Sequence, residues 1–175
     1  MRHHLVVLMC LAAWPGVASA QSPLAADTWL LSPSIGIAFN PDGDPSLSAA
    51  VGAGYPLTPV FAVEGELGHL FDMASDNPDV DASLTTVHGS LLYFLETGSA
   101  VLPYFAAGLG VGRYSVDAPP FEGGTTELGF NLGGGVTYPM ADNVWLRGDF
   151  RYFKHIDEVP SAWRFSIGVT LPLGN

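Results

Sequence analysis

Charged side chains recur at every second position in two segments of this chain. Glu64 and Glu66 form one pair, and Arg147, Asp149 and Arg151 form a longer set with the same spacing. A spacing of two places side chains on one face of a β-strand. Carboxylates and guanidinium groups on facing strands form strong, charge-assisted hydrogen bonds. The chemistry that this pattern favours is therefore a network of ion pairs.

The expected network has members on five strand-like segments and is enclosed by them. Its eight members are Glu64, Glu66, His88, Glu127, Arg147, Asp149, Arg151 and Arg164. A charge enclosed without a partner is very costly, so these groups must pair with one another. A structural salt-bridge network is the favoured interpretation. A gated polar path and a functional site are the two alternatives.

His155 is a candidate catalytic base, because it lies next to Asp157 and Glu158. Acids beside an imidazole can orient a general base. A triad also needs a nucleophile, and the nearby hydroxyl of Ser161 has the wrong spacing. We therefore expect no enzyme, and no cofactor.

An acidic loop is the candidate for metal binding. Asp72, Asp76, Asp79 and Asp81 could hold a divalent cation weakly through their carboxylates. The loop lacks the glycine and the terminal glutamate of an EF-hand. The favoured interpretation is a solvated acidic loop, and no defined metal site is expected.

The segments that must position these side chains alternate between apolar and small or polar residues. From Leu128 to Tyr138 every second residue is apolar or glycine, and the residues between are glycine, asparagine and threonine. The segment after Val144 carries its arginines opposite its aromatic residues. A soluble sheet buries its apolar face, whereas a membrane-spanning β-barrel turns that face to lipid and keeps a polar lumen. The pattern thus predicts a transmembrane barrel.

Turn residues divide the chain into eight such segments, and eight is an even number known for small barrels. We expect an all-β, eight-stranded, antiparallel, up-and-down transmembrane β-barrel. Each segment has about ten residues or more, enough to cross a bilayer at a tilt. The expected strands are Trp29–Asn40, Ser46–Tyr55, Val60–Phe71, Ser83–Leu95, Pro103–Ser115, Leu128–Tyr138, Val144–Tyr152 and Ser161–Leu173. The fourth has the least clear faces, because Leu92 and Phe94 share the parity of the polar residues.

The N-terminus predicts export. Arg2 precedes the apolar run Leu5–Ala13, and Ala18–Ala20 has the small residues of a cleavage site. We expect residues 1–20 to be a signal peptide and residues 21–175 to form the barrel. The chain has 17 acidic residues against 6 Lys and Arg, a net charge of −11. Such acidity argues against nucleic acid as a partner.

Large aromatic residues near the strand ends are expected to form girdles at the two membrane interfaces. These residues are Tyr55, Phe61, Phe71, Tyr93, Phe105, Tyr138, Tyr152 and Trp163. A soluble, lipocalin-like periplasmic carrier is the alternative fold. It would turn these rings inward and expose the glycines and arginines to water, so the membrane barrel is favoured.

The second half of the chain also resembles a known family. The segments Pro103–Gly110, Asn131–Tyr138, Asp142–Phe153 and Trp163–Val169 are similar to small outer-membrane β-barrel domain proteins. These are grouped with the porin-like and OmpA-type eight-stranded barrels of Gram-negative bacteria. The chain departs from them in ending Leu171–Asn175, without a terminal aromatic residue. No peptidoglycan-binding domain follows, so a wall-tethering role is not expected.

The resemblance implies an outer-membrane location, insertion by the barrel-assembly machinery, and contact with outer-membrane lipid and lipopolysaccharide. We expect a monomeric structural or surface-interaction barrel with a lumen filled by side chains. A small passive pore for ions or small solutes is the main alternative. A lipid A-modifying barrel enzyme is less favoured, because the His-x-Ser of the lipid A deacylases corresponds here to His155-Ile156-Asp157.

Overall fold

A computed structural model describes residues 27–39, 45–73, 81–118, 121–157 and 159–173. The expected signal peptide lies outside these residues. All regular structure in the described part of the chain is β-strand. No helix in that part is both long and apolar enough to cross a membrane. The strands are β1 (Trp29–Phe39), β2 (Ser46–Pro56), β3 (Phe61–Leu70), β4 (Asp81–Phe94), β5 (Leu102–Ala118), β6 (Phe121–Ala141), β7 (Val144–His155) and β8 (Ala162–Leu173).

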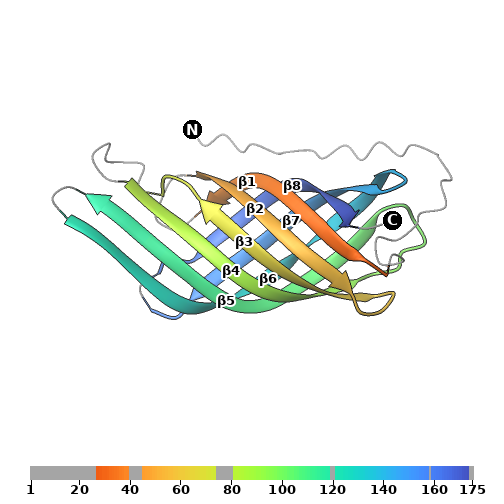
Figure 1. Cartoon of the computed structure of the whole chain (residues 1–175), viewed down its shortest axis with the longest axis horizontal. Coiled ribbons are helices and arrows are strands. Elements are labelled where there is room, and N and C mark those ends of the chain that lie inside the picture. Colours follow the sequence, from red (N-terminus) through yellow and green to blue (C-terminus); the bar gives the residue numbers. More distant parts are fainter. Residues whose placement is uncertain (1–26, 40–44, 74–80, 119–120, 158, 174–175) are drawn as a thin grey trace, which may run out of the picture.

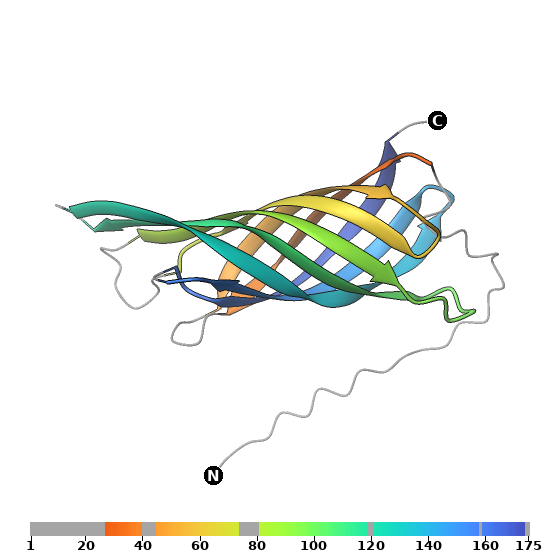
Figure 2. The ribbon, with the colours of Figure 1, turned by 90° about the horizontal axis from the view of Figure 1, so that it is seen from below.

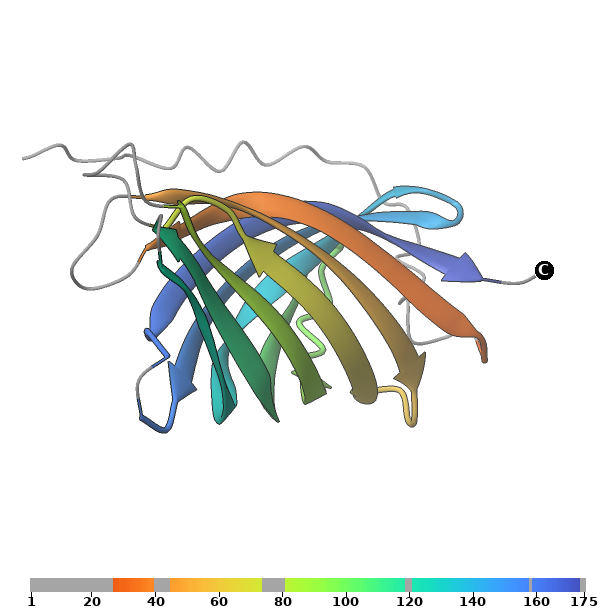
Figure 3. The same cartoon turned by 60° about the vertical axis from the view of Figure 1, so that its left-hand side comes forward.

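The eight strands form one closed antiparallel barrel in which each strand pairs with its neighbours along the chain (Figure 1). β1 closes the ring against β8, with Ile35 opposite Ile167. Figure 3 shows the ring of strands from a second direction. The eight-stranded, up-and-down barrel expected from the sequence is confirmed.

The two ends of the barrel differ in their connections. The start of β1 and the end of β8 lie together at one end, with the turns that follow β2, β4 and β6. We call this the terminus end. The connections that follow β1, β3, β5 and β7 lie at the other end, which we call the loop end.

Apolar side chains lie on the outside of the barrel and polar ones on the inside. Along β3 and β4, exposed and buried residues alternate strictly over most of each strand. Leu109, on the outer face of β5, is 74% exposed, whereas Arg151, on the inner face of β7, is 0% exposed. This distribution is the reverse of that in a soluble barrel and suits a lipid environment.

The strands β5 and β6 are longer than the sequence predicted. The sequence predicted strands that end at Ser115 and begin at Leu128, but most of the segment between them continues the hairpin, whose paired residues reach Ala118 and Phe121. The glycines of this segment do not end the strand, since Gly123 and Gly124 pair with Val116 and Ser115 of β5. The β5–β6 hairpin consequently projects beyond the other strands at the loop end (Figure 2).

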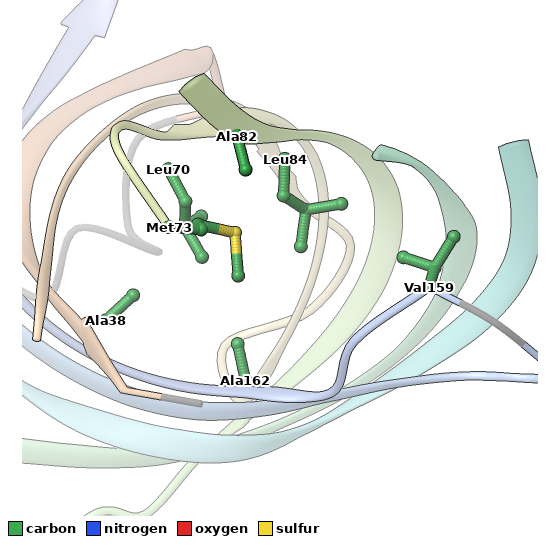
Figure 4. Packing of buried hydrophobic residues seen from close by; sticks show 7 residues of the cluster. All are labelled: Ala38, Leu70, Met73, Ala82, Leu84, Val159 and Ala162. Atoms are coloured by element: carbon green, nitrogen blue, oxygen red, sulfur yellow. The ribbon is translucent and has the colours of Figure 1, made fainter. Parts of the chain in front are cut away.

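Each end of the lumen is filled by an apolar cluster. At the loop end the cluster consists of Ala38, Leu70, Met73, Ala82, Leu84, Val159 and Ala162, which point into the barrel (Figure 4). At the terminus end it consists of Ala62, Leu92, Phe94, Tyr104 and Ala106. The inner parity of Leu92 and Phe94, ambiguous in the sequence, is thus explained by their packing against inward residues of the neighbouring strands β3 and β5. The charged residues lie between these two clusters.

Candidate functional site: the charged layer of the lumen

Three arginines and three carboxylates form one layer inside the barrel. Strand alternation turns Glu64 and Glu66 of β3 inward, together with alternate residues of β7 and Arg164 of β8. The six residues are Glu64, Glu66, Arg147, Asp149, Arg151 and Arg164, and all are buried. Their formal charges cancel, so the layer is neutral as a whole.

Glu64 is the centre of the layer. Its carboxylate forms an ion pair with Arg147 Nη1. Arg147 Nη2 donates to Glu64 Oε1 at 3.0 Å, and Arg151 Nη2 donates to the same oxygen at 2.8 Å. One carboxylate from β3 therefore holds two guanidinium groups from β7.

Asp149 pairs with the same two arginines from the opposite side. Arg147 Nη2 and Arg151 Nε each lie 3.1 Å from Asp149 Oδ2. Tyr104 adds a third donor, because its hydroxyl donates to Asp149 Oδ2 at 2.5 Å and accepts from Arg147 Nε at 2.8 Å. Tyr104 is not among the eight network members expected from the sequence.

Arg164 completes the layer on β8. Its Nη2 lies 2.8 Å from both oxygens of Glu66, and its guanidinium lies 4.9 Å from the ring centroid of Phe153. Arg151 Nη1 is 4.0 Å from Glu66 Oε2, which joins this pair to the centre of the layer. The network therefore spans the lumen from β3 to β8.

The layer leaves almost no open space. A cavity of about 10 Å³ remains beside Glu64, Glu66, Arg147 and Asp149. A single water molecule needs about 10–15 Å³. Packed between two apolar clusters, this layer fills the lumen as side chains do in other eight-stranded barrels.

Two of the expected network members lie toward the loop end instead. His88 is directly opposite Glu66 in the β3–β4 pairing, and its ring lies 5.1 Å from Phe153 and 6.2 Å from His155. Glu127 of β6 lies opposite Gly112 of β5, near the loop end. Its Oε2 accepts hydrogen bonds from the backbone nitrogens of Asp157 at 2.9 Å and Val159 at 3.2 Å.

The aromatic residues expected at the interfaces lie at the two ends of the barrel's outer face. The terminus end carries Tyr55, Phe61, Tyr93, Phe105 and Tyr138, and the loop end carries Phe71, Tyr152 and Trp163. Phe61 and Tyr93 are 5.0 Å apart between ring centroids, and Tyr152 and Trp163 are 4.5 Å apart. Trp29, which the sequence did not single out, packs 5.4 Å from Tyr55.

Comparison with known proteins agrees with this inside-out barrel. Residues 6–171 match the family described as outer membrane protein beta-barrel domain. This chain belongs to that family. The resemblance drawn from the sequence is therefore confirmed. Membership of this family also supports the expected location in the outer membrane. No curated protein matches the sequence significantly.

Solved structures of outer-membrane barrels share the fold. Neisserial surface protein A is 23% identical, with a TM-score of 0.70, over 85% of this chain and 98% of that one. The N-terminal barrel of Pseudomonas aeruginosa OprF is 18% identical, with a TM-score of 0.59, over 84% and 98%. The attachment invasion locus protein Ail of Yersinia pestis is 12% identical, with a TM-score of 0.56, over 82% and 97%. At these identities the likeness establishes the fold alone.

An enzyme also shares this outer-membrane fold. The outer membrane enzyme PagL is 14% identical, with a TM-score of 0.50, over 82% of this chain and 99% of that one. In the present chain His155 is buried, and its Nδ1 lies 3.2 Å from the carbonyl oxygen of Pro160. Among the described residues no hydroxyl is hydrogen-bonded to this histidine.

The acidic loop of this outer-membrane barrel is only partly described. Asp76 and Asp79 lie outside the described residues. Asp72 and Asp81 line a cavity at the loop end, together with residues of β5. Within the described part of the chain no group of three or more potential metal ligands occurs.

Proposed function

We propose that this protein is a structural and surface-interaction barrel of the outer membrane that does not conduct. The observation that carries the proposal is the neutral layer of three arginines and three carboxylates, packed between apolar clusters at both ends of the lumen. An ion crossing the lumen would have to displace buried, paired charges, which is strongly unfavourable. A rigid filled barrel presents its loops and its outer face to partners.

Conductance of the refolded protein in a planar bilayer tests this proposal against a small passive pore. The expected trace is that of the bare bilayer across the voltage range, with a sixteen-stranded porin as the positive control. Reproducible single-channel steps from the purified barrel would contradict the proposal. A gel shift on boiling, measured on the same sample, ensures that folded protein was tested.

We further propose that the loop end faces the cell exterior. Barrels of this kind have short periplasmic turns and longer extracellular loops. The turn after β2 and the turn between β6 and β7 are short, which fits a periplasmic terminus end. A protease added to intact cells should cut at the β3–β4 connection and leave the turn at Asp142 intact.

Export, assembly and association complete the proposal. We propose cleavage after Ala20, insertion by the barrel-assembly machinery, and a monomer surrounded by lipid and lipopolysaccharide. A closed barrel has no unpaired strand edge through which copies could join, which supports the monomer. N-terminal sequencing of the protein from outer membranes should begin at Gln21. A protein that still begins at Met1 would contradict cleavage.

A further inference from the structure

A cavity of about 580 Å³ lies at the loop end, between the end of β3, the start of β4 and the β5–β6 hairpin. Its lining includes His69, Phe71, Asp81, Arg113, Ser115 and Asp117. These residues have the parity of the outer face, the same as Leu67 on β3, Val87 on β4 and Val111 on β5. The inward residues Ala82 and Val116 also line it, so the cavity opens on the outer face and borders the apolar cluster at the loop end, apart from the charged layer. Its size is that of a small-molecule site.

Along β4 and β5, the outer face changes from apolar to polar between one outward pair of residues and the next, at the edge of this cavity. Val87 of β4 lies opposite Val111 of β5, and the next outward pair is Thr85 with Arg113. Beyond that pair, Asp81 lies opposite Asp117. At about 3.3 Å per residue, the polar part of these strands extends about 20 Å beyond the apolar row. With strands tilted by about 40°, this corresponds to a height of about 15 Å. A head-group layer is about 5–8 Å deep on each side of the bilayer, so the polar part spans that layer and extends beyond it.

The polar wall occurs on one side of the barrel. On the opposite side, the outward residues Ile37 and Phe39 of β1 and Trp163 of β8 remain apolar up to the loop end. The longer β5–β6 hairpin, whose strand β5 carries Arg113, Ser115 and Asp117, extends farther at the loop end than β1 (Figure 2). A head group lying against the barrel would meet several hydrogen-bonding side chains on the β3–β5 side, whereas the β1–β8 side offers it the apolar residues Ile37, Phe39 and Trp163.

His69 in the cavity is already hydrogen-bonded, with its Nδ1 2.9 Å from Thr85 Oγ1, so the capacity for binding lies in the charged side chains. Among the described residues, none forms an ion pair with Arg113, which is exposed. Asp81 and Asp117 face each other as like charges, an arrangement that is unfavourable until donors lie between them. Phe71 is 43% exposed, and its ring lies 4.5 Å from that of His69 in an edge-on contact.

A sugar suits this combination of groups. Its hydroxyls can donate to the facing carboxylates of Asp81 and Asp117, and its oxygens or a phosphate substituent can accept from Arg113. The apolar C–H face of a sugar ring can pack on Phe71. A simple anion would be repelled by the two aspartates, and a simple cation would leave the guanidinium unpaired.

We propose that this cavity binds the sugar head group of a glycolipid in the surrounding leaflet. A lipid is favoured over a free sugar because one glycolipid can place its acyl chains on Val87, Val111 and Leu128 while its head group enters the cavity directly beyond them. The inference rests on the proposed orientation and lipid contact of the barrel. It does not depend on whether the lumen conducts.

The test is binding of lipopolysaccharide to the folded barrel in phospholipid nanodiscs. Native mass spectrometry and amide NMR shifts should show saturable binding of one molecule, with the largest shifts at His69, Arg113 and Ser115. The variants Arg113→Gln and Asp117→Asn should each weaken binding at least tenfold. The matched controls Lys154→Gln, on the outer face of β7, and Asp142→Asn, in the turn before β7, should leave binding unchanged.

Three further arms identify the source of the ligand. The delipidated sugar of the same lipopolysaccharide should bind at least tenfold more weakly, and inorganic phosphate and extra phospholipid should give no saturable shifts. Binding of the free sugar as tightly as the whole lipid would overturn the lipid assignment. Binding that Arg113→Gln and Asp117→Asn change by less than twofold would overturn the site. Channel steps in the bilayer experiment would contradict the filled lumen and leave this result standing.

Discussion

Arg151 of β7 and Arg164 of β8 occupy directly opposite positions on the lumen wall. Like charges in such cross-strand positions repel each other. The two guanidinium groups are nevertheless fully enclosed, because Glu64 pairs with Arg151 and Glu66 pairs with Arg164. The two glutamates, two residues apart on β3, are thus spaced so that each reaches one arginine of this pair across the barrel. The first prediction follows from this match.

Replacing Glu64 by alanine should strongly destabilise the barrel. The substitution leaves Arg147 and Arg151 buried with Asp149 as their shared carboxylate, and removing one partner of a buried pair costs on the order of 3–5 kcal/mol. Urea unfolding in lipid vesicles, followed by tryptophan fluorescence, measures the loss. Asp142→Ala is the matched control, since Asp142 is exposed in a turn and should change stability by less than about 0.5 kcal/mol. Equal midpoints for the two variants would show that the network contributes nothing.

The sequence predicted the faces of the strands better than the heights of residues along them. The period of two assigns Glu64, Arg151 and Glu127 to the lumen, because it depends on local geometry alone. The height of each residue depends on how neighbouring strands are staggered around the closed ring. Glu127 pairs with Gly112 near the loop end, whereas Gly133, three inward positions further along β6, pairs with Arg151. Parity alone could not separate these two levels.

Tyr104 illustrates the same limit. Its inward parity was clear, but its role depends on Gly135, its direct partner on β6. A side chain at Gly135 would fill the space that the phenol occupies on its way to Asp149. The sequence contains both residues but not the pairing that brings them together. The same holds for the cavity, because Arg113 and Phe71 become neighbours only through the β3–β4–β5 register.

Gly135→Ala should therefore disrupt the charged layer from its edge. A Cβ atom at this position would lie 2.1 Å from the carbonyl oxygen of Gly148 and 2.6 Å from the hydroxyl of Tyr104. Such overpacking costs about 1–3 kcal/mol, and here it also displaces a donor to Asp149. The measurement is again the urea midpoint in vesicles.

Gly65→Ala is the control for that variant. Gly65 lies on the outer face of β3, where a Cβ atom would meet nothing within 4 Å. The added methyl group should leave the midpoint unchanged or raise it slightly. If the two variants had the same urea midpoint, the close approach of Tyr104 to β6 would not contribute to the stability of the charged layer.

The last prediction concerns the lipid-facing surface. Leu109 projects from the middle of β5 and is 74% exposed, with Ala107 and Val111 as its outward neighbours along the strand. Arginine at the bilayer midplane of such a barrel costs about 2–4 kcal/mol, because its charge must leave water for hydrocarbon. Leu109→Arg should lower stability in vesicles by that amount. In detergent micelles, which deform around a charge, the loss should be smaller.

Ile156→Arg provides the comparison at the membrane edge. Ile156 is also apolar and is 66% exposed, but it follows β7 at the loop end, beyond the aromatic residues Tyr152 and Trp163. An arginine at this level can reach water, so its cost should fall to about 0–1 kcal/mol. The difference between the two variants measures the depth of the apolar band without reference to the lumen. If both substitutions cost the same, the hydrocarbon boundary does not lie between Leu109 and Ile156, and the placement of the membrane on the outer face would have to change.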